Sequence, residues 1–333
     1  MDPVFILSSP RSFTSVVSGM VGMHPFLYSI PELHLLEQDR VDQLISYFMT
    51  ERQEKKLHGL RRLVSQLIIG EQTLDGVHMA DRWLERRMSM STGDLYRELI
   101  EMTGGLGFVD KSPAYSLSAL TLERLDRTFK NAKFIHLVRH PIGQGLSMAK
   151  LLPASLSSRQ RIADIRSKYR QELKQIPQLA KDLIFTRNTE SDIESESEYK
   201  DKIVIDFQYL WMRMQKRIIT FLEGIDQTRK MTLRGEDFLK DPLATMQEIS
   251  KFVEIPWMAD YSEFVLHPEQ SPYACLGPQG AQFGNDVNYL QSPGYSKREF
   301  QIPTFASKVI PWKKDGSEFE EEVIRMARAL GYD

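Results

Sequence analysis

A short polar turn between two apolar stretches is the first place in the chain where the residue types suggest chemistry. The run Val4–Leu7 has the composition of a strand buried on both faces, and Ser15–Met23 carries apolar residues at helical spacing. Backbone N–H groups at the start of such a helix bind anions, and hydroxyl side chains in the turn add donors. The pattern therefore predicts a phosphate-binding loop. Its residues are Arg11, Ser12, Phe13, Thr14 and Ser15.

This loop differs from the Walker A motif that holds magnesium-bound triphosphates. Walker A is Gly-x-x-x-x-Gly-Lys-Ser/Thr, in which the lysine contacts the terminal phosphates and the hydroxyl binds magnesium. The loop here has no glycine and carries Arg11 instead of the lysine. We therefore expect an anion other than a magnesium-bound triphosphate, and no metal at this site.

Three segments resemble, in the same order along the chain, the motifs of sulfotransferases that use 3′-phosphoadenosine-5′-phosphosulfate (PAPS) as donor. Ser8–Ser15 resembles the 5′-phosphosulfate loop of that family. Lys133–Pro141, followed by Ser147, resembles its 3′-phosphate motif, a strand ending in Arg-x-Pro with a serine in the next helix. Arg234–Pro242 resembles its Arg-Tyr-Glu-Asp-Leu-x-x-Asp-Pro strand-to-helix turn. The resemblance spans residues 4 to about 256 and implies PAPS-dependent transfer of sulfonate to a hydroxyl, with 3′-phosphoadenosine 5′-phosphate (PAP) as product.

The chain is most similar to the sulfotransferase domains of polyketide assembly lines. The runs that carry this similarity are Phe5–Arg11, Pro31–Leu36 and Val109–Tyr115. Those domains sulfonate a β-hydroxyacyl chain on an acyl carrier protein, which activates it for loss of sulfate and carboxylate to leave a terminal alkene. The resemblance thus implies an acyl carrier protein as partner. Alternatives are a sulfotransferase of a free small-molecule alcohol, a P-loop kinase and a nucleotide-binding module without catalysis.

The predicted elements alternate between strands and helices, which indicates an α/β fold with a P-loop-like parallel sheet flanked by helices. A helical insertion is expected at about residues 150–202, in which the basic run Arg159–Arg170 is a candidate docking surface for an acidic carrier protein. Residues 267–305 are rich in Gly, Pro, Asn and Gln and are expected to form an irregular flap over the active site. Because the separated motifs serve one site, a single domain, residues 1–333, is expected. The expected strands are Val4–Leu7, Phe108–Val109, Phe134–Val138 and Met231–Leu233, with Ile203–Ile205 as a further candidate.

Composition excludes several classes of protein. A formal net charge of −2 gives no global field that attracts nucleic acid. Cys275 is the only cysteine, so neither a disulfide framework nor a cysteine-rich metal site is expected. The sequence shows no basic-apolar signal segment, and no apolar run approaches the ~20 residues of a membrane helix. We expect a cytoplasmic protein without membrane or nucleic-acid partners.

Sulfuryl transfer requires stabilisation of charge on the leaving phosphate oxygen, mostly by positioning and electrostatics. A sulfuryl group carries less negative charge than a phosphoryl group, so cationic side chains can serve without a metal. Arg11 and Lys111 are the candidate cations. A guanidinium in the loop can grip two oxygens at once. Lys111 follows a strand end, and related sulfotransferases with a Lys-Ser pair at this point use the lysine at the transferring group. The structural alternatives are a turn cap for Arg11 and an ordinary surface lysine for Lys111.

Two further pairs of residues are candidates for binding the 3′-phosphate of the donor. Arg139 and Ser147 follow the predicted strand, where a guanidinium fork would lie at the carboxyl edge of the sheet that binds ligands in open α/β folds. A structural ion pair is the alternative for Arg139. Lys297 and Arg298, in the irregular stretch, could reach the same phosphate, and a solvated loop explains them equally well.

Glu32 and His267 compete for the role of general base. Glu32 resembles the position of a catalytic glutamate in several sulfotransferases, but a reference pKa of about 4.3 makes it a poor base unless burial raises the pKa. His267, at the start of the flap, can accept a proton near pH 7 without such a shift. The sequence favours Glu32 slightly. His34 lies in an apolar run and is given no role.

Overall fold

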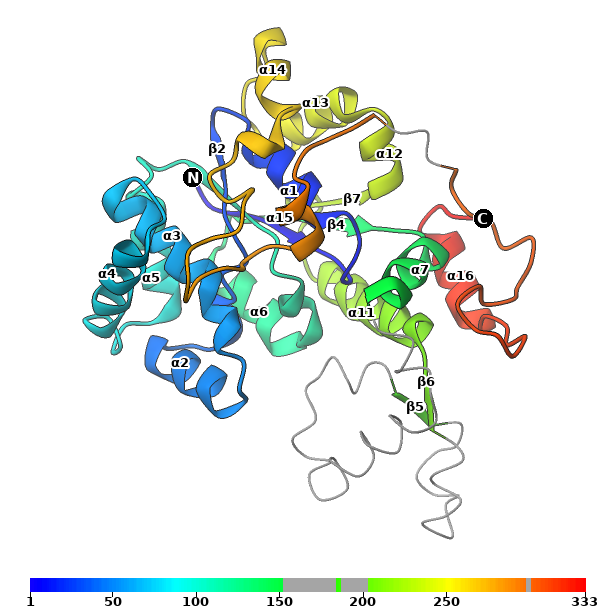
Figure 1. Cartoon of the computed structure of the whole chain (residues 1–333). Coiled ribbons are helices and arrows are strands. Elements are labelled where there is room, and N and C mark those ends of the chain that lie inside the picture. The colour runs from blue at the N-terminus through cyan, green and yellow to red at the C-terminus, as the bar shows by residue number, and fades with distance from the viewer. Residues whose placement is uncertain (152–183, 187–202, 298–300) are drawn as a thin grey trace. The chain divides into compact units, whose positions relative to one another are not determined.

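The computed structural model describes residues 1–151, 184–186, 203–297 and 301–333 (Figure 1). Most of the predicted helical insertion, the basic run Arg159–Arg170 and the candidate Arg298 lie outside these ranges. The chain divides by its internal contacts into two compact units. The first unit consists of Met1–Ser8, Phe13–Leu137 and Ile218–Phe300, and the second of Ser9–Ser12, Val138–Arg217 and Gln301–Asp333. The expectation of a single domain stays a prediction.

A five-stranded sheet with the order β2-β3-β1-β4-β7 lies at the centre of the first unit. β1 pairs in parallel with β3 and β4, and β2 pairs in parallel with β3. Every residue of β1 and β3 is buried, as expected of parallel strands covered by helices on both faces. The predicted α/β fold is therefore confirmed. The strands are β1 (Val4–Leu7), β2 (Leu27–Ser29), β3 (Gly107–Asp110), β4 (Lys133–Val138) and β7 (Lys230–Arg234).

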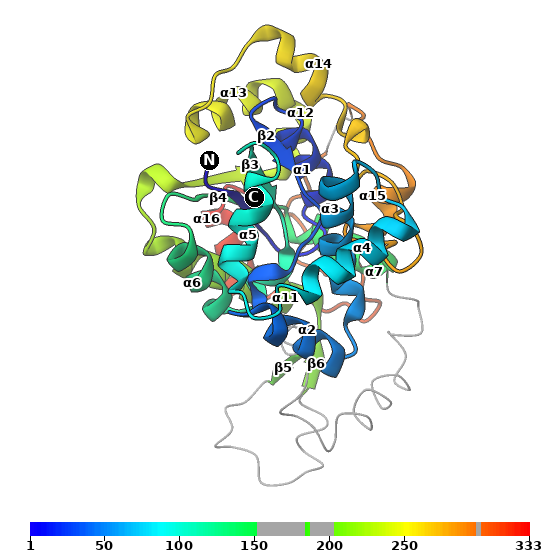
Figure 2. The same ribbon diagram turned by 90° about the vertical axis from the view of Figure 1, so that its left-hand side faces the viewer.

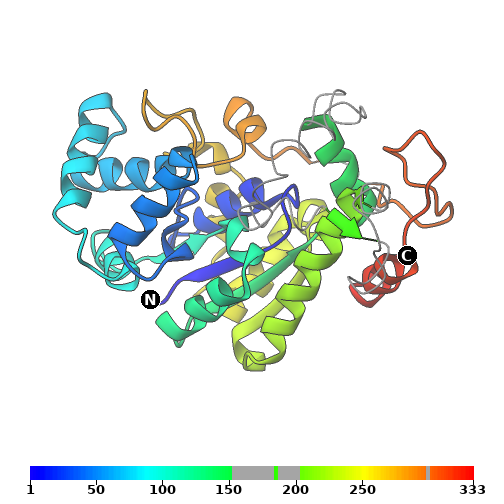
Figure 3. The same cartoon turned by 90° about the horizontal axis from the view of Figure 1, so that it is seen from below.

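Side chains of β1 alternate between two cores, one on each face of the sheet. Phe5 and Leu7 pack into a core that includes residues of α2 to α6, whereas Val4 and Ile6 pack into a core that includes residues of α1, α12 and α13. α3 and α4 pack side by side on the first of these faces (Figures 2 and 3). The helices are α1 (Thr14–Gly22), α2 (Val41–Thr50), α3 (Leu57–Ile69), α4 (Leu74–Glu85), α5 (Thr92–Glu101), α6 (Ala119–Thr128), α12 (Gly235–Lys240) and α13 (Pro242–Val253).

The predicted flap is irregular, as expected, apart from short helical turns such as α15 (Val287–Gln291). Its described part within the first unit is tied to α3 by the fully buried side chain of Arg62. Arg62 donates a hydrogen bond to the carbonyl of Phe283 at 3.2 Å and another to Gln72, which in turn donates to the carbonyl of Pro272 at 2.7 Å. The flap also contacts the loop after β2 that carries Glu32, because the Glu32 N–H donates a hydrogen bond to the Gly284 carbonyl at 2.6 Å.

The second unit has its own core, which contains Val138, Trp211, Phe305 and Val323. Its helices are α7 (Pro141–Leu151), α16 (Glu321–Ala329) and the first part of α11 (Phe207–Glu223). β5 (Ile184–Thr186) pairs antiparallel with β6 (Ile203–Ile205), so the further strand candidate at Ile203–Ile205 is confirmed as a strand outside the central sheet. None of the helices in the described residues is long and apolar enough to cross a membrane.

The close packing of α3 against the Glu32 loop generates a first prediction. A Cβ at Gly59 would lie 2.0 Å from the carbonyl oxygen of Glu32, so Gly59→Ala must displace the backbone of the loop that carries Glu32. We expect a loss of about 1–3 kcal/mol in the free energy of unfolding, despite the better helix propensity of alanine. Urea denaturation measures it.

Gly224→Ala is the matched control, because its Cβ would meet its nearest neighbour at an ordinary 3.6 Å. Its stability should stay within about 0.5 kcal/mol of the parent. Equal stability of both variants would contradict the close packing of Gly59 on the loop.

Candidate functional site

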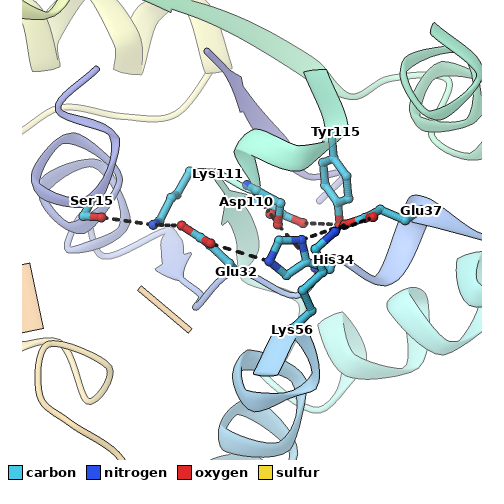
Figure 4. A network of polar contacts seen from close by, with 9 residues as sticks. Ser15, Glu32, His34, Glu37, Lys56, Asp110, Lys111 and Tyr115 are labelled. Atoms are coloured by element: carbon cyan, nitrogen blue, oxygen red, sulfur yellow. Dashed lines mark hydrogen bonds and ion pairs between the residues drawn. The ribbon is translucent and has the colours of Figure 1, made fainter. Parts of the chain in front are cut away.

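The ends of neighbouring parallel strands bring Ser15, Glu32 and Lys111 together (Figure 4). Ser15 lies in the first turn of α1 after β1, Glu32 follows β2, and Lys111 comes directly after β3. Lys111 is fully buried, and its Nζ donates hydrogen bonds to Ser15 Oγ at 3.0 Å and to Glu32 Oε1 at 2.5 Å. The sequence singled out all three residues, and the structure places them in direct contact.

The pKa of Glu32 is lowered to about 2 in this arrangement. Burial, the largest influence, raises the pKa, but the positive charges of Lys111 and His34 outweigh it. A glutamate base needs a raised pKa near neutral pH, whereas the net effect of these contacts on Glu32 is to lower it. Glu32 is thus an ionised partner of Lys111 as long as Lys111 remains bound to it.

The charges continue beyond Glu32 through His34, Glu37 and Lys56 (Figure 4). The Nε2 of His34 lies 3.5 Å from Glu32 Oε2, and its Nδ1 lies 2.7 Å from Glu37 Oε1. Lys56 Nζ lies 2.9 Å from Glu37 Oε2. Burial lowers the pKa of His34, but the two carboxylates outweigh burial and raise it above the ordinary value. Positive and negative groups therefore alternate from Lys111 to Lys56, an arrangement named here the charge ladder.

A second buried carboxylate, Asp110, holds the turn that carries Lys111. It accepts hydrogen bonds from the Ser112 hydroxyl at 2.8 Å and from the hydroxyls of Tyr96 and Tyr115, both at 3.2 Å. Burial is the largest influence on its pKa and raises it. Neutral donors rather than a cation thus satisfy Asp110, and they fix the direction in which the next residue, Lys111, leaves β3.

The loop after β1 has the backbone conformation of a glycine turn without containing glycine. Arg11 and Phe13 have φ values of 67° and 63°, in the left-handed region. Phe13 thus adopts a backbone conformation that glycine favours, at a cost of order 1–3 kcal/mol. Phe13 occupies the N-cap position of α1, and its side chain makes no capping hydrogen bond to the first turn of the helix.

In the second unit, the structure brings together Arg11, Arg139 and Ser147. Arg11 Nε donates to Ser147 Oγ at 3.1 Å, and Arg139 Nη1 donates to the Arg11 carbonyl at 2.8 Å. Burial lowers the pKa of Arg11, which still carries its charge at neutral pH. The indole of Trp211 donates to the Arg139 carbonyl at 2.9 Å and fixes the backbone there. Arg11 and Arg139, both predicted to bind phosphate groups of the donor, are therefore linked to each other and to Ser147 by these hydrogen bonds.

Of the remaining predicted site residues, His267 and Lys297 are described by the structure and Arg298 is not. His267 is 46% exposed, and its Nδ1 lies 2.7 Å from Glu269 Oε1. Within residues 1–151 and 203–297, His267 makes no hydrogen bond or ion pair with Glu32 or Lys111. Lys297 is exposed, and Arg298 is not described. Among the described residues, no cluster of His, Cys, Asp and Glu is placed to hold a metal ion.

Sequence reasoning missed the charge ladder beyond Glu32. Its signal was present, since Glu32, His34 and Glu37 lie within one six-residue run. The apolar neighbours of His34, namely Leu33, Leu35 and Leu36, are typical of a core segment without chemistry. They point into the core, while the left-handed backbone of His34, with φ of 54°, turns its ring toward the carboxylates.

The parallel sheet, the anion loop after β1 and the polar groups at the strand ends together have the architecture of a sulfotransferase. A model of the sulfotransferase family matches residues 3–189, more than half of the chain, and the chain therefore belongs to that family. This confirms the family predicted from the sequence. No curated protein matches the chain.

Two solved structures share the fold over the whole chain. A sulfotransferase domain from the curacin biosynthetic pathway is 23% identical with a TM-score of 0.66, covering 100% of this chain and 98% of its own. A sulfotransferase domain from the Synechococcus PCC 7002 olefin synthase is 21% identical with a TM-score of 0.66, covering 100% of this chain and 95% of its own. These similarities establish the fold.

The buried ion pair generates a prediction about stability. Lys111→Met would leave the Glu32 carboxylate without its closest cation, so the pKa of Glu32 should rise and the free energy of unfolding should fall by about 3–5 kcal/mol at neutral pH. The contribution of Glu32 in the parent is present above its unfolded pKa of 4.5 and is lost as pH falls through about 2. The difference between the two proteins should therefore shrink over that window.

Urea denaturation at a series of pH values measures this difference. The double variant Lys111→Met/Glu32→Gln is the control and should recover part of the lost stability, because it removes the unpaired charge as well. A Lys111→Met protein as stable as the parent at neutral pH would contradict the ion pair.

Proposed function

We propose that this sulfotransferase moves a sulfonate group from PAPS to a hydroxyl, and that the hydroxyl is the β-hydroxyl of an acyl chain on an acyl carrier protein. The observation that carries the proposal is the buried Lys111, which bonds both the anion loop, through Ser15, and the candidate base Glu32. A cation so placed can serve the transferring group and influence the group that removes the acceptor proton.

The chemistry of the side chains fits the donor. Backbone N–H groups at the start of α1, with the hydroxyls of Ser12, Thr14 and Ser15, suit the 5′-phosphosulfate. The buried hydroxyl of Ser8, at the end of β1, has no partner among the described residues and offers a further donor. Arg139 and Ser147 would hold the 3′-phosphate, with Lys297 and Arg298 as further candidates. Arg11 would add a fixed positive charge at the loop.

The transfer itself forms a bond between the acceptor oxygen and the donor sulfur and breaks the bond from sulfur to the bridging phosphate oxygen. PAP leaves, and the acceptor proton passes to a base. Lys111 would shift toward the sulfonate or the bridging oxygen when the donor is bound. Because Lys111 keeps the pKa of Glu32 low, that shift would raise the pKa and make Glu32 a better base. His267 remains the second candidate, reachable through movement of the flap.

The choice of acceptor rests on the sequence resemblance to polyketide sulfotransferase domains and on the shared fold with the curacin-pathway and olefin-synthase domains. A free small-molecule alcohol is the second candidate. A P-loop kinase fits less well, because β4 is followed by Arg139 rather than by an aspartate that would hold magnesium. The direct test is incubation with labelled PAPS and a panel of β-hydroxyacyl carrier proteins and free alcohols. Label on none of them would contradict the proposed function.

The assignment of the 3′-phosphate generates a prediction. Arg139→Ala should weaken PAP binding by about 2–4 kcal/mol, because a charge-assisted bidentate contact is lost. Binding of adenosine 5′-phosphate, which lacks the 3′-phosphate, should change much less, and titration calorimetry measures both.

Arg328→Ala, which removes an exposed arginine from α16 in the same unit, should bind PAP like the parent. An Arg139→Ala protein that still prefers PAP over adenosine 5′-phosphate as strongly as the parent does would overturn the assignment.

The identity of the base generates another prediction. Glu32→Gln should lower kcat by about 10² to 10⁴ and leave PAP affinity nearly unchanged, because the amide keeps the shape of the side chain but accepts no proton. His267→Gln should mainly raise the KM for the acceptor. Steady-state kinetics with a carrier-bound substrate separate the two. Loss of turnover in His267→Gln, with Glu32→Gln near the parent rate, would reverse the roles.

A further inference from the structure

His34 occupies the middle of the charge ladder and has no role in the reaction as proposed so far. One ring nitrogen faces Glu32 Oε2 at 3.5 Å and the other faces Glu37 Oε1 at 2.7 Å (Figure 4). A ring with a carboxylate at each nitrogen is most stable as the imidazolium, which donates at both positions. His34 is therefore a buried cation between two anions.

Every element packed around His34 restrains it. The ring of Phe48, on α2, meets the imidazole edge to face with centroids 6.3 Å apart. Lys56, in the turn before α3, donates hydrogen bonds to both carboxylate oxygens of Glu37, at 3.1 Å to Oε1 and 2.9 Å to Oε2. The backbone N–H of His34 donates to Ser112 Oγ at 3.4 Å, and Ser112 in turn donates to Asp110. The charged groups around the ring are thus Glu32, Glu37 and Lys56, with Lys111 and Asp110 one contact further away.

The two oxygens of Glu32 have separate partners. Lys111 takes Oε1 at 2.5 Å, and His34 faces Oε2. Lys111 and His34 are the two cations that contact the Glu32 carboxylate in the part of the chain that the structure describes. If Lys111 turns toward a bound donor, His34 is the one that remains. The contacts of His34 with Glu37, Phe48 and Ser112 do not involve the side chain of Lys111.

We infer that His34 is a positioning residue for Glu32, which holds the carboxylate in place while Lys111 serves the donor. The inference rests on the proposed function, in which Glu32 contacts the reacting hydroxyl. It predicts that Glu32 keeps its orientation only while His34 is protonated. Sulfonate transfer should then decline at alkaline pH, as His34 loses its proton.

The direction of the pH effect follows from the contacts. The two carboxylates raise the pKa of His34, while the charge of Lys56 opposes them. The stability that His34 contributes is fully present below its unfolded pKa of about 6.5 and is lost as pH rises through the higher folded value. Lys56→Met removes the opposing charge and should move the alkaline limb of the activity profile to higher pH.

His34→Gln tests the inference, and His78→Gln, at an exposed position on α4, is the matched control. The His34 variant should lose about 10- to 100-fold in kcat, as positioning partners of functional groups typically do. PAP affinity should be unchanged. The alkaline limb attributed to His34 should disappear from its pH–rate profile, whereas His78→Gln should match the parent in all respects. Unchanged kcat and an unchanged profile in His34→Gln would overturn the inference.

A measurement without turnover separates this inference from the proposed function. The carboxyl carbon of Glu32, followed by ¹³C NMR, should titrate at higher pH in His34→Gln than in the parent and in His78→Gln. If the parent transfers no sulfonate to any acceptor, the proposed function fails, yet this titration still decides whether His34 controls Glu32. An unchanged titration of Glu32 in His34→Gln would overturn the role of His34 even in an active enzyme.

Discussion

The ion pair between Lys111 and Glu32 is the interaction on which the rest of the site depends. A fully buried ammonium group is tolerated only with close partners, because desolvation of an unpaired charge costs several kcal/mol. The fold supplies those partners from separate elements. Asp110 fixes the turn that aims Lys111, while Gly59 and Gly284 allow α3 and the flap to pack closely on the loop that carries Glu32. The charge ladder then places an opposite charge beside each member of the pair.

This arrangement explains why a carboxylate with a pKa of about 2 can still be proposed as a base. Its low pKa is a property of the contact with Lys111 and His34, not of the loop alone. A bound donor anion would compete for Lys111, so donor binding and activation of Glu32 would be coupled through one ammonium group. In the proposed mechanism His34 keeps the carboxylate oriented during that exchange.

Much of the fold could be predicted from the sequence, because β1, β3 and β4 are largely apolar runs that are buried in the sheet. β2 escaped prediction because Leu27–Ser29 offers only three residues without an apolar run. The loop residues and Lys111 were identified by motif, but the contact between Lys111 and Glu32 joins residues 79 positions apart, and no local pattern encodes it. The low pKa of Glu32 likewise depends on that contact, so it could not be predicted from residue type and position in the sequence.

In the proposed mechanism Lys111 is shared between Glu32 and the sulfonate donor. A crystal structure of the protein with bound PAPS would show whether the donor takes this ammonium group. We expect Lys111 Nζ at hydrogen-bond distance from an oxygen of the sulfonate or from the bridging oxygen, with the 3′-phosphate on Arg139 and Ser147 and the ring of His34 still against Glu32. PAPS bound with Lys111 still paired only with Ser15 and Glu32, and with no contact from Lys111 to the donor, would contradict the account.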